Sequence, residues 1–407
     1  MAANLRSPYL LSVRDTVAWL WITVGLIGLT LIYFRRKRPF GSLRPFHLLT
    51  IAAVLGGIIA GHGHWRHARN RNAVLSAPSD RIPELGKHLV IGWLGYQETR
   101  DLAAKGAIAG VFLTKRDFKA GSSVSEIRHI VDELQRARRE ARLPPLWIAT
   151  DQEGGSVERL TPPLPDQEGL GLILRDLDGP GIQQDPERAA EIVRRVTVFA
   201  EIQGSALAEA GINMNFAPVV DIRPKNQPDK LDIHTRIASR ALAEDPDVIA
   251  LAGETYVRVL AKHGITAVLK HFPGLGRVPS DTHHFSASLS TEVRELEASD
   301  WVPFREITNR TRAGIMLGHV HLTALDPDQP ASCSGIVIRE YLREEWNVKG
   351  LLVTDDFSMT PIFHGPGGIV GATRKSIAAG VDLILLSYDA EAAYDLLAAG
   401  MEDPFEK

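Results

Sequence analysis

The sequence predicts an α/β fold of the (β/α)8 TIM-type barrel class, preceded by an N-terminal transmembrane segment or helical hairpin. Strand-like apolar runs alternate with helical patterns, and eight such units fit within residues 88–407. Alternation of this kind implies parallel strands joined by crossover helices, and eight units match this barrel in number and size. An open doubly wound sheet is the alternative, but no Gly-x-Gly-x-x-Gly follows the first run, which argues against a dinucleotide fold.

Each predicted strand is a short apolar run, rich in β-branched residues. The eight runs are 88–95, 107–114, 146–150, 212–220, 264–269, 313–318, 350–354 and 380–387. Between them, apolar residues recur at helical spacing over 125–142, 186–210, 245–263, 292–308, 336–346 and 372–379. The pattern therefore predicts helices that cover the outside of the barrel.

Composition indicates a globular body that does not bind nucleic acid. Hydrophobic residues make up 44% of the chain and charged residues 23%. Residues 1–75 carry ten Lys or Arg and one Asp, which is +9, so the net charge of −3 leaves −12 for residues 76–407. An acidic body without a basic stripe is a poor partner for nucleic acid. The single cysteine, Cys333, excludes an internal disulfide and a cysteine-cluster metal site.

Residues 1–75 are predicted to be a membrane anchor. The stretch of about 16–34 is uncharged, long enough to span a bilayer and aromatic at both ends, and about 46–62 is a shorter, glycine-rich second candidate. If both span, the basic loop between them lies in the cytoplasm and the body lies on the periplasmic side of the inner membrane. If only the first spans, the same rule places the body in the cytoplasm. Residues 76–87 are then a linker and 88–407 the catalytic barrel domain.

Ionisable residues follow five consecutive predicted strands. They are Asp151 and Glu153, Asp221, Lys270 and His271, His319 and His321, and Asp355 and Asp356. In a barrel these strand ends converge on one face, where active sites lie. We expect Glu153 to support its neighbours, Asp221 to pair with a nearby Arg or Lys, and the two later histidines to stand on the barrel rim.

A ring of carboxylates and histidines suits two chemistries. One is attack by a carboxylate on the anomeric carbon of a sugar, with a second group protonating the leaving oxygen. The other is metal-dependent hydrolysis, with His319 and His321 among the ligands of an ion that activates water. A protein without catalytic activity that binds cell-wall glycan is a third interpretation.

The densest polar stretch runs from Lys270 to His284 and breaks at Pro273, Gly274 and Gly276. Five segments occur in a fixed order: 151–155 (DQEGG), 215–221 (NFAPVVD), 270–274 (KHFPG) with 281–283 (DTH), 330–334 (PASCS), and 353–359 (VTDDFSM). Together they resemble glycoside hydrolase family 3 in its β-N-acetylglucosaminidase (β-N-acetylhexosaminidase) branch, over about residues 85–400.

The resemblance implies a role for each site residue and no metal or organic cofactor. Asp355 matches the nucleophile, and His283 with its partner Asp281 matches the acid/base dyad. Asp151, Arg240, Lys270 and His271 match sugar-binding residues. An imidazole suits the acid/base role because it titrates near neutrality.

The implied activity is that of a retaining exo-β-N-acetylglucosaminidase acting on peptidoglycan-type or related glycans. A β-glycoside phosphorylase, a β-glucosidase and a β-xylosidase are alternatives within the same family. Three positions depart from the family pattern: Leu275 replaces a common histidine, Arg277 stands near a position that is often acidic, and Ser239 replaces the usual aspartate before Arg240. These departures bear on the substrate more than on the reaction.

Overall fold

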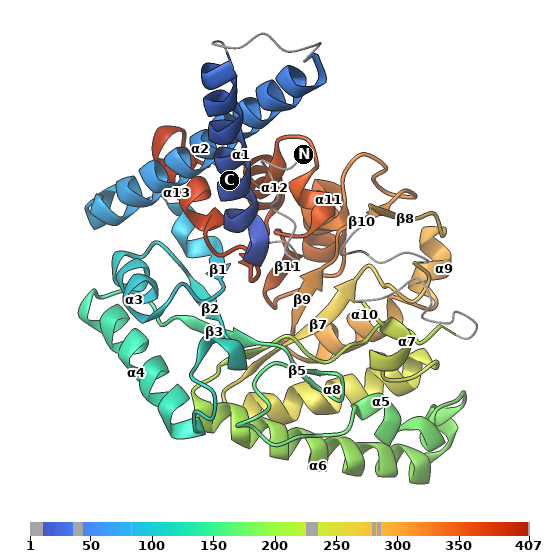
Figure 1. Ribbon diagram of the computed structural model, residues 1–407. Helices are drawn as coiled ribbons and strands as arrows, with labels where there is room; N and C mark the ends of the chain where they lie inside the picture. Colours follow the sequence, from blue (N-terminus) through green and yellow to red (C-terminus); the bar gives the residue numbers. More distant parts are fainter. Residues whose placement is uncertain are drawn as a thin grey trace.

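The computed structural model describes residues 11–35, 44–82, 84–224, 235–278, 282 and 286–405. Its body is a closed barrel of parallel strands inside a ring of helices (Figure 1). The barrel strands are β1 (Leu89–Ile91), β2 (Gly110–Phe112), β3 (Trp147–Thr150), β6 (Met214–Asn215), β7 (Thr266–Phe272), β9 (Gly314–Leu317), β11 (Leu352–Asp356) and β12 (Leu383–Leu386). Each overlaps one of the eight predicted runs, so the predicted (β/α)8 barrel is confirmed.

Neighbouring strands in the barrel follow the order of the chain. The last strand closes onto the first, since Val90 of β1 pairs with Gly110 of β2 on one side and Leu385 of β12 on the other. Two small sheets stand outside the barrel. In one, β4 (Gln152–Gly154) pairs antiparallel with β5 (Val157–Glu158), and in the other, β10 (Val320–Leu322) pairs parallel with β8 (Ala287–Leu289).

The hydrophobic core has two parts because successive strand residues point to opposite faces. One cluster fills the barrel interior and includes Val90, Phe112, Phe216 and Val353, with the rings of Phe112 and Phe216 stacked 5.8 Å apart. A much larger cluster lies between the strands and the helices. The interior is thus packed rather than open, which leaves the strand ends as the place for a site.

Helices alternate with the strands and form the outer ring. The longer ones are α3 (Tyr96–Lys105), α4 (Val124–Glu140), α6 (Pro186–Ala210), α8 (Pro246–Lys262), α10 (Val302–Arg310), the π-helix η8 (Ile336–Glu345), α12 (Gly368–Ala379) and α13 (Ala392–Glu402). Side-chain caps fix several starts: Ser123 and Glu126 form a capping box at α4, and Asp185 caps α6 just before its N-terminal proline.

The helix predicted over 292–308 is instead two helices, α9 (Val293–Glu297) and α10. Pro303 lies in the first turn of α10. Proline is tolerated in a first turn and disruptive inside a longer helix, because it lacks the N–H group.

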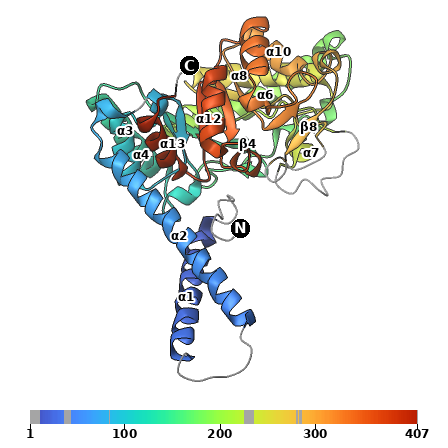
Figure 2. The same ribbon diagram turned by 90° about the horizontal axis from the view of Figure 1, so that it is seen from above.

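Helices α1 (Leu11–Arg35) and α2 (Arg44–Ser76) pack against each other and project from the barrel (Figure 2). Within the described ranges, neither these helices nor any other has a stretch both long and apolar enough to cross a membrane. The spans predicted at about 16–34 and 46–62 are therefore not supported. From His62 onward α2 is largely polar and basic. The periplasmic location inferred from those spans stays an untested prediction.

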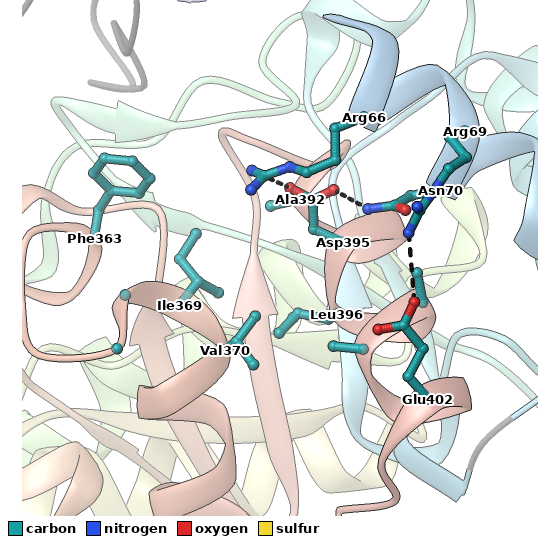
Figure 3. A pocket seen from close by; sticks show the side chains of 14 residues that line it. Arg66, Arg69, Asn70, Phe363, Ile369, Val370, Ala392, Asp395, Leu396 and Glu402 are labelled. Carbon is teal, nitrogen blue, oxygen red and sulfur yellow. Dashed lines mark hydrogen bonds and ion pairs between the residues drawn. The ribbon is translucent and has the colours of Figure 1, made fainter. Parts of the chain in front are cut away.

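The C-terminal part of α2 packs on the barrel domain. The Asn70 amide donates to Asp395 on α13 at 2.9 Å, and Arg71 donates to both oxygens of Glu98 on α3. A cavity of about 400 Å³ lies between α2, α12 and α13, where Arg66 and Arg69 pair with Asp395 and Glu402 (Figure 3). Helix α2 ends at Ser76, one residue after the predicted end of the anchor at residue 75.

Candidate active site

A cavity of about 460 Å³ lies at the carboxyl ends of the barrel strands. Five of the seven predicted site residues line it: Asp151, Arg240, Lys270, His271 and Asp355. They come from the ends of β3, β7 and β11 and from the short helix α7 (Ile237–Arg240). The other two, Asp281 and His283, lie outside the described residues.

A buried network of ion pairs forms one side of the cavity. The Lys270 ammonium contacts Asp151 at 2.7 Å and Glu153 at 2.6 Å. Arg240 donates to both oxygens of Glu153, at 2.9 and 2.6 Å. Burial alone would raise the pKa of Glu153, but the charges of Arg240 and Lys270 outweigh it and hold this pKa well below its ordinary value. Glu153 is therefore the expected support for its neighbours, since it stays ionised and fixes both cations.

The local fold explains why these cations are fixed. Strand β7 extends through Lys270 and His271, and the chain after β6 runs beside it, with the Val220 N–H donating to the Lys270 carbonyl at 2.9 Å. Arg240 also donates to the Thr235 carbonyl at 2.6 Å. Charged donors held in this way can bind hydroxyl groups without rearranging.

The two aspartates at the end of β11 have different surroundings. Asp355 is partly exposed, and its Oδ1 accepts from the Asp356 N–H at 2.8 Å. The Asp356 carboxylate is buried and accepts from the backbone N–H groups of Ser358, Ser387 and Tyr388, and from the Ser387 hydroxyl. Burial raises the pKa of Asp356, although these donors oppose the effect. Asp356 thus ties β11 to β12, while Asp355 is the more accessible of the two.

The two histidines after β9 follow the end of a strand as expected, but they do not line the cavity, and His319 is the more buried of the two. That side chain is buried, with Nδ1 2.9 Å from the Ser332 hydroxyl and Nε2 3.0 Å from the Asp356 carbonyl. His321 instead hydrogen-bonds the Pro327 carbonyl. In the part of the chain that the structure describes, no group of three or more His, Cys, Asp or Glu side chains is placed to hold a metal ion.

The lining residues that the sequence analysis did not single out include Trp93, Arg159 and Tyr388. Trp93 and Tyr388 follow β1 and β12, so the strand-end rule would have found them had it included aromatic residues. Arg159 directly follows β5, in the hairpin after Asp151. Burial raises the pKa of Tyr388 to about 12, and nearby carboxylates, including Asp355, add to the effect against the opposing charge of Arg159.

The three departures from the family pattern are accommodated locally. Leu275 is 4% exposed in the core and uses only its backbone N–H toward the site. Arg277 pairs with Asp300 at 2.8 Å and with Glu295 at 2.5 Å. The Ser239 hydroxyl donates to the Arg236 carbonyl at 3.0 Å. Asp221 was expected to pair with an Arg or Lys, but its partner is His271, at 2.8 Å.

Comparison with known proteins places these features in one family. Residues 83–403 match the model for the glycosyl hydrolase family 3 N terminal domain. A β-hexosaminidase from Xanthomonas axonopodis pv. citri (strain 306) is 33% identical over 315 residues, which cover 76% of this chain and 86% of that protein.

Two solved structures show the same similarity in three dimensions. A glycoside hydrolase family 3 β-N-acetylglucosaminidase from Paenibacillus sp. str. FPU-7 matches with a TM-score of 0.67 and 30% identity. The match covers 79% of this chain but 58% of that longer protein. NagZ from Neisseria gonorrhoeae in complex with N-trifluoroacetyl-D-glucosamine matches with a TM-score of 0.64 and 27% identity, covering 80% of this chain and 86% of that one.

Proposed function

The chain belongs to glycosyl hydrolase family 3 and is a glycosidase, and on that premise we propose that it is a retaining exo-β-N-acetylglucosaminidase. Its substrates are terminal β-linked N-acetylglucosamine residues of peptidoglycan-type or related glycans. The names of the similar proteins, β-hexosaminidase and β-N-acetylglucosaminidase, support the sugar. The N-acylated glucosamine bound by the Neisseria protein supports recognition of an N-acyl group.

One observation carries the proposal: Asp355 lines the same cavity as Asp151, Arg240, Lys270 and His271. A carboxylate that faces a sugar pocket can attack the anomeric carbon as the bond to the leaving oxygen breaks. The product is a glycosyl ester on Asp355. Water then attacks the same carbon and releases the sugar with its original configuration.

The four binding residues hold the sugar during both steps. Asp151, Lys270 and Arg240 present charged hydrogen-bonding groups, which bind hydroxyls more strongly than neutral groups do. Their ion pairs with each other and with Glu153 fix them before substrate arrives. Hydrogen bonds of this kind that strengthen as positive charge develops on the ring lower the barrier.

We assign proton transfer to His283, with Asp281 as its partner, on the sequence motif alone. The described residues just before them are well anchored. The Leu275 N–H donates to Asp221 at 2.7 Å, and the Arg277 side chain pairs with Asp300 and Glu295 on the opposite side. The acid/base motif therefore begins from a fixed point beside the cavity.

A mechanism-based label tests the nucleophile and the stereochemistry together. A 2-deoxy-2-fluoroglucoside with an activated leaving group, in which fluorine replaces the 2-acetamido group, slows both steps but the second one more in effect, so the intact protein should gain the mass of one fluorinated sugar, mapped by peptide analysis to Asp355. Asp355→Ala should acquire no label and should lose release of a chromogenic N-acetylglucosaminide. An adduct on another residue, or an inverted product in wild type, would overturn the assignment.

A phosphorylase built on the same site is distinguished by its product. Arg159 at the cavity wall could attract phosphate as well as sugar. Turnover of the chromogenic substrate should proceed equally with and without phosphate and should yield free N-acetylglucosamine. Faster turnover in phosphate with formation of the sugar 1-phosphate would replace hydrolysis by phosphorolysis.

A further inference from the structure

Asp221 is a buried carboxylate beside the cavity. It lies in the extended segment after β6, where the Val220 N–H donates to the Lys270 carbonyl at 2.9 Å. This pairing brings Asp221 next to His271, and the Asp221 side chain has no exposed surface. An ionised side chain in such a position must be held by several donors, because burial without them costs free energy.

The donors to Asp221 come from the end of β7 and from the loop that follows it. Its Oδ2 accepts from the His271 backbone N–H at 3.0 Å and contacts the His271 Nδ1 at 2.8 Å. Its Oδ1 accepts from the Leu275 N–H at 2.7 Å. One carboxylate therefore holds both the sugar-binding histidine and the start of the segment that leads to Asp281 and His283.

The contact fixes which nitrogen of His271 carries hydrogen. A carboxylate oxygen accepts hydrogen bonds, so Nδ1 is the donor, and Nε2 is the ring nitrogen that Asp221 does not engage. His271 lines the cavity, and none of the residues that the structure describes hydrogen-bonds its Nε2. The Nε2 atom is thus the part of the ring available to a ligand.

The backbone next to Asp221 also supports the loop. A Cβ atom on Gly276 would lie 2.2 Å from the Ile222 carbonyl oxygen, so the chain after Leu275 packs directly on the residue that follows Asp221. Only glycine fits this approach. Leu275 and Gly276 therefore both lie directly against the Asp221–Ile222 dipeptide.

We propose that Asp221 is a positioning residue that acts through His271. It holds Nδ1 protonated and Nε2 facing the sugar, and it secures the root of the acid/base segment through Leu275. The nature of the ligand rests on the proposed function, whereas the Asp221–His271 relationship does not. A carboxylate that served only to anchor the loop would affect stability without affecting the tautomer of His271.

Asp221→Asn separates these two roles. Its one carbonyl oxygen can replace only one carboxylate oxygen, so the amide group must face either Leu275 N–H or His271 Nδ1–H. We expect kcat/KM for a chromogenic N-acetylglucosaminide to fall about 10- to 100-fold, as when a buried donor loses its acceptor. In a His271→Ala background the same substitution should change kcat/KM by about threefold or less, because residues that act together are not additive.

A spectroscopic readout tests the inference without activity. In protein with 15N-labelled histidine, the His271 signals, assigned by their absence in His271→Ala, should show hydrogen on Nδ1 in wild type and an altered tautomer in Asp221→Ala, which leaves the Nδ1–H group without its acceptor. Asp178→Asn is the matched control, since Asp178 also accepts from two backbone N–H groups, those of Glu244 and Asp245, away from His271. It should lower stability but leave the tautomer and kcat/KM unchanged.

Two results would overturn the inference. Equal losses of activity from Asp221→Asn with and without His271 would show that the two residues act independently. An unchanged His271 tautomer in folded Asp221→Ala would reduce Asp221 to a structural anchor. If wild type cleaves no β-N-acetylglucosaminide, the proposed function fails, while the tautomer measurement still decides the role of Asp221.

Discussion

Lys270 and Glu153 form a 2.6 Å ion pair in which the two side chains are only 3% and 6% exposed. Glu153 binds Arg240 through both carboxylate oxygens as well. One carboxylate therefore contacts two cations at the cavity wall. Asp151, which contacts Lys270, supplies the second negative charge. The sugar-binding charges depend on a residue that need not touch the sugar.

Removal of the Glu153 charge should lower stability markedly. Breaking a buried ion pair from one side leaves its partner uncompensated, which typically costs about 3 to 5 kcal/mol. Glu153→Gln should therefore lower the free energy of unfolding, measured by urea denaturation, by an amount in that range. The control is Asp132→Asn, which removes an exposed pair with Arg128 on α4 and should change stability far less. Equal effects of the two substitutions would contradict the assignment.

Stability should also fall at acid pH because of Glu153. Its pKa is lower in the folded chain than the ordinary value of 4.5, so the unfolded state binds a proton first as pH falls. The stabilisation is complete above about pH 4.5 and is lost progressively below it. Unfolding free energies measured at intervals from pH 6 to pH 3 should decline more steeply for wild type than for Glu153→Gln. Equal pH dependence of the unfolding free energy in the two proteins would contradict this role of Glu153.

Asp356→Asn should lower activity more than substrate binding. The NH2 group of the asparagine would face either the backbone N–H group of Ser358 or those of Ser387 and Tyr388, and the end of β11 that carries Asp355 would shift. We expect kcat to fall about tenfold or more, since small displacements of a reacting group are costly, while KM changes little. Steady-state kinetics checks this, with Ser387→Ala as a milder variant that removes a single donor. A rise in KM alone would contradict it.

Tyr388 should not contribute to the pH dependence of activity. Its pKa of about 12 keeps the phenol neutral throughout the range in which the enzyme is assayed. Tyr388→Phe should therefore leave both limbs of the pH profile of kcat/KM in place between pH 5 and pH 9, whatever its effect on the maximum. A displaced basic limb would show that the hydroxyl titrates in this range.

Chelation should leave activity unchanged. The histidines that suggested a metal site form other hydrogen bonds. His319 bonds to the Ser332 hydroxyl and the Asp356 carbonyl, and His321 bonds to the Pro327 carbonyl. Protein dialysed against EDTA should hydrolyse the chromogenic substrate at the original rate. Loss of activity that added zinc restores would favour the metal-dependent hydrolase.

The barrel and the place of its site could be predicted because both follow from local pattern. Strands alternate with helices, and Asp151, Lys270 and Asp355 stand at strand ends that a barrel must bring together. Partners within the site could not be predicted in the same way. Asp221 lies 50 residues from His271 in the chain. Its choice of a histidine rather than an Arg or Lys depends on how the segment after β6 pairs with β7.

One helix was predicted incorrectly because the apolar pattern is continuous where the helical backbone is interrupted. The periodicity over 292–308 does not reveal the break before α10, because the apolar residues on both sides face the same core. Near the N-terminus, the composition change at residue 75 lies one residue before the end of α2 at Ser76, but it did not reveal that Asn70 and Arg71 bind α13 and α3.

Helix α2 joins α1 to the barrel as one continuous helix. Its 33 residues span about 50 Å without a hinge. The direction of the catalytic face relative to α1 is therefore set by the helical phase of α2. Insertion of one residue near Gly61 would turn α1 and the first part of α2 by about 100° around the axis of α2. A flexible linker at this point would have absorbed the change.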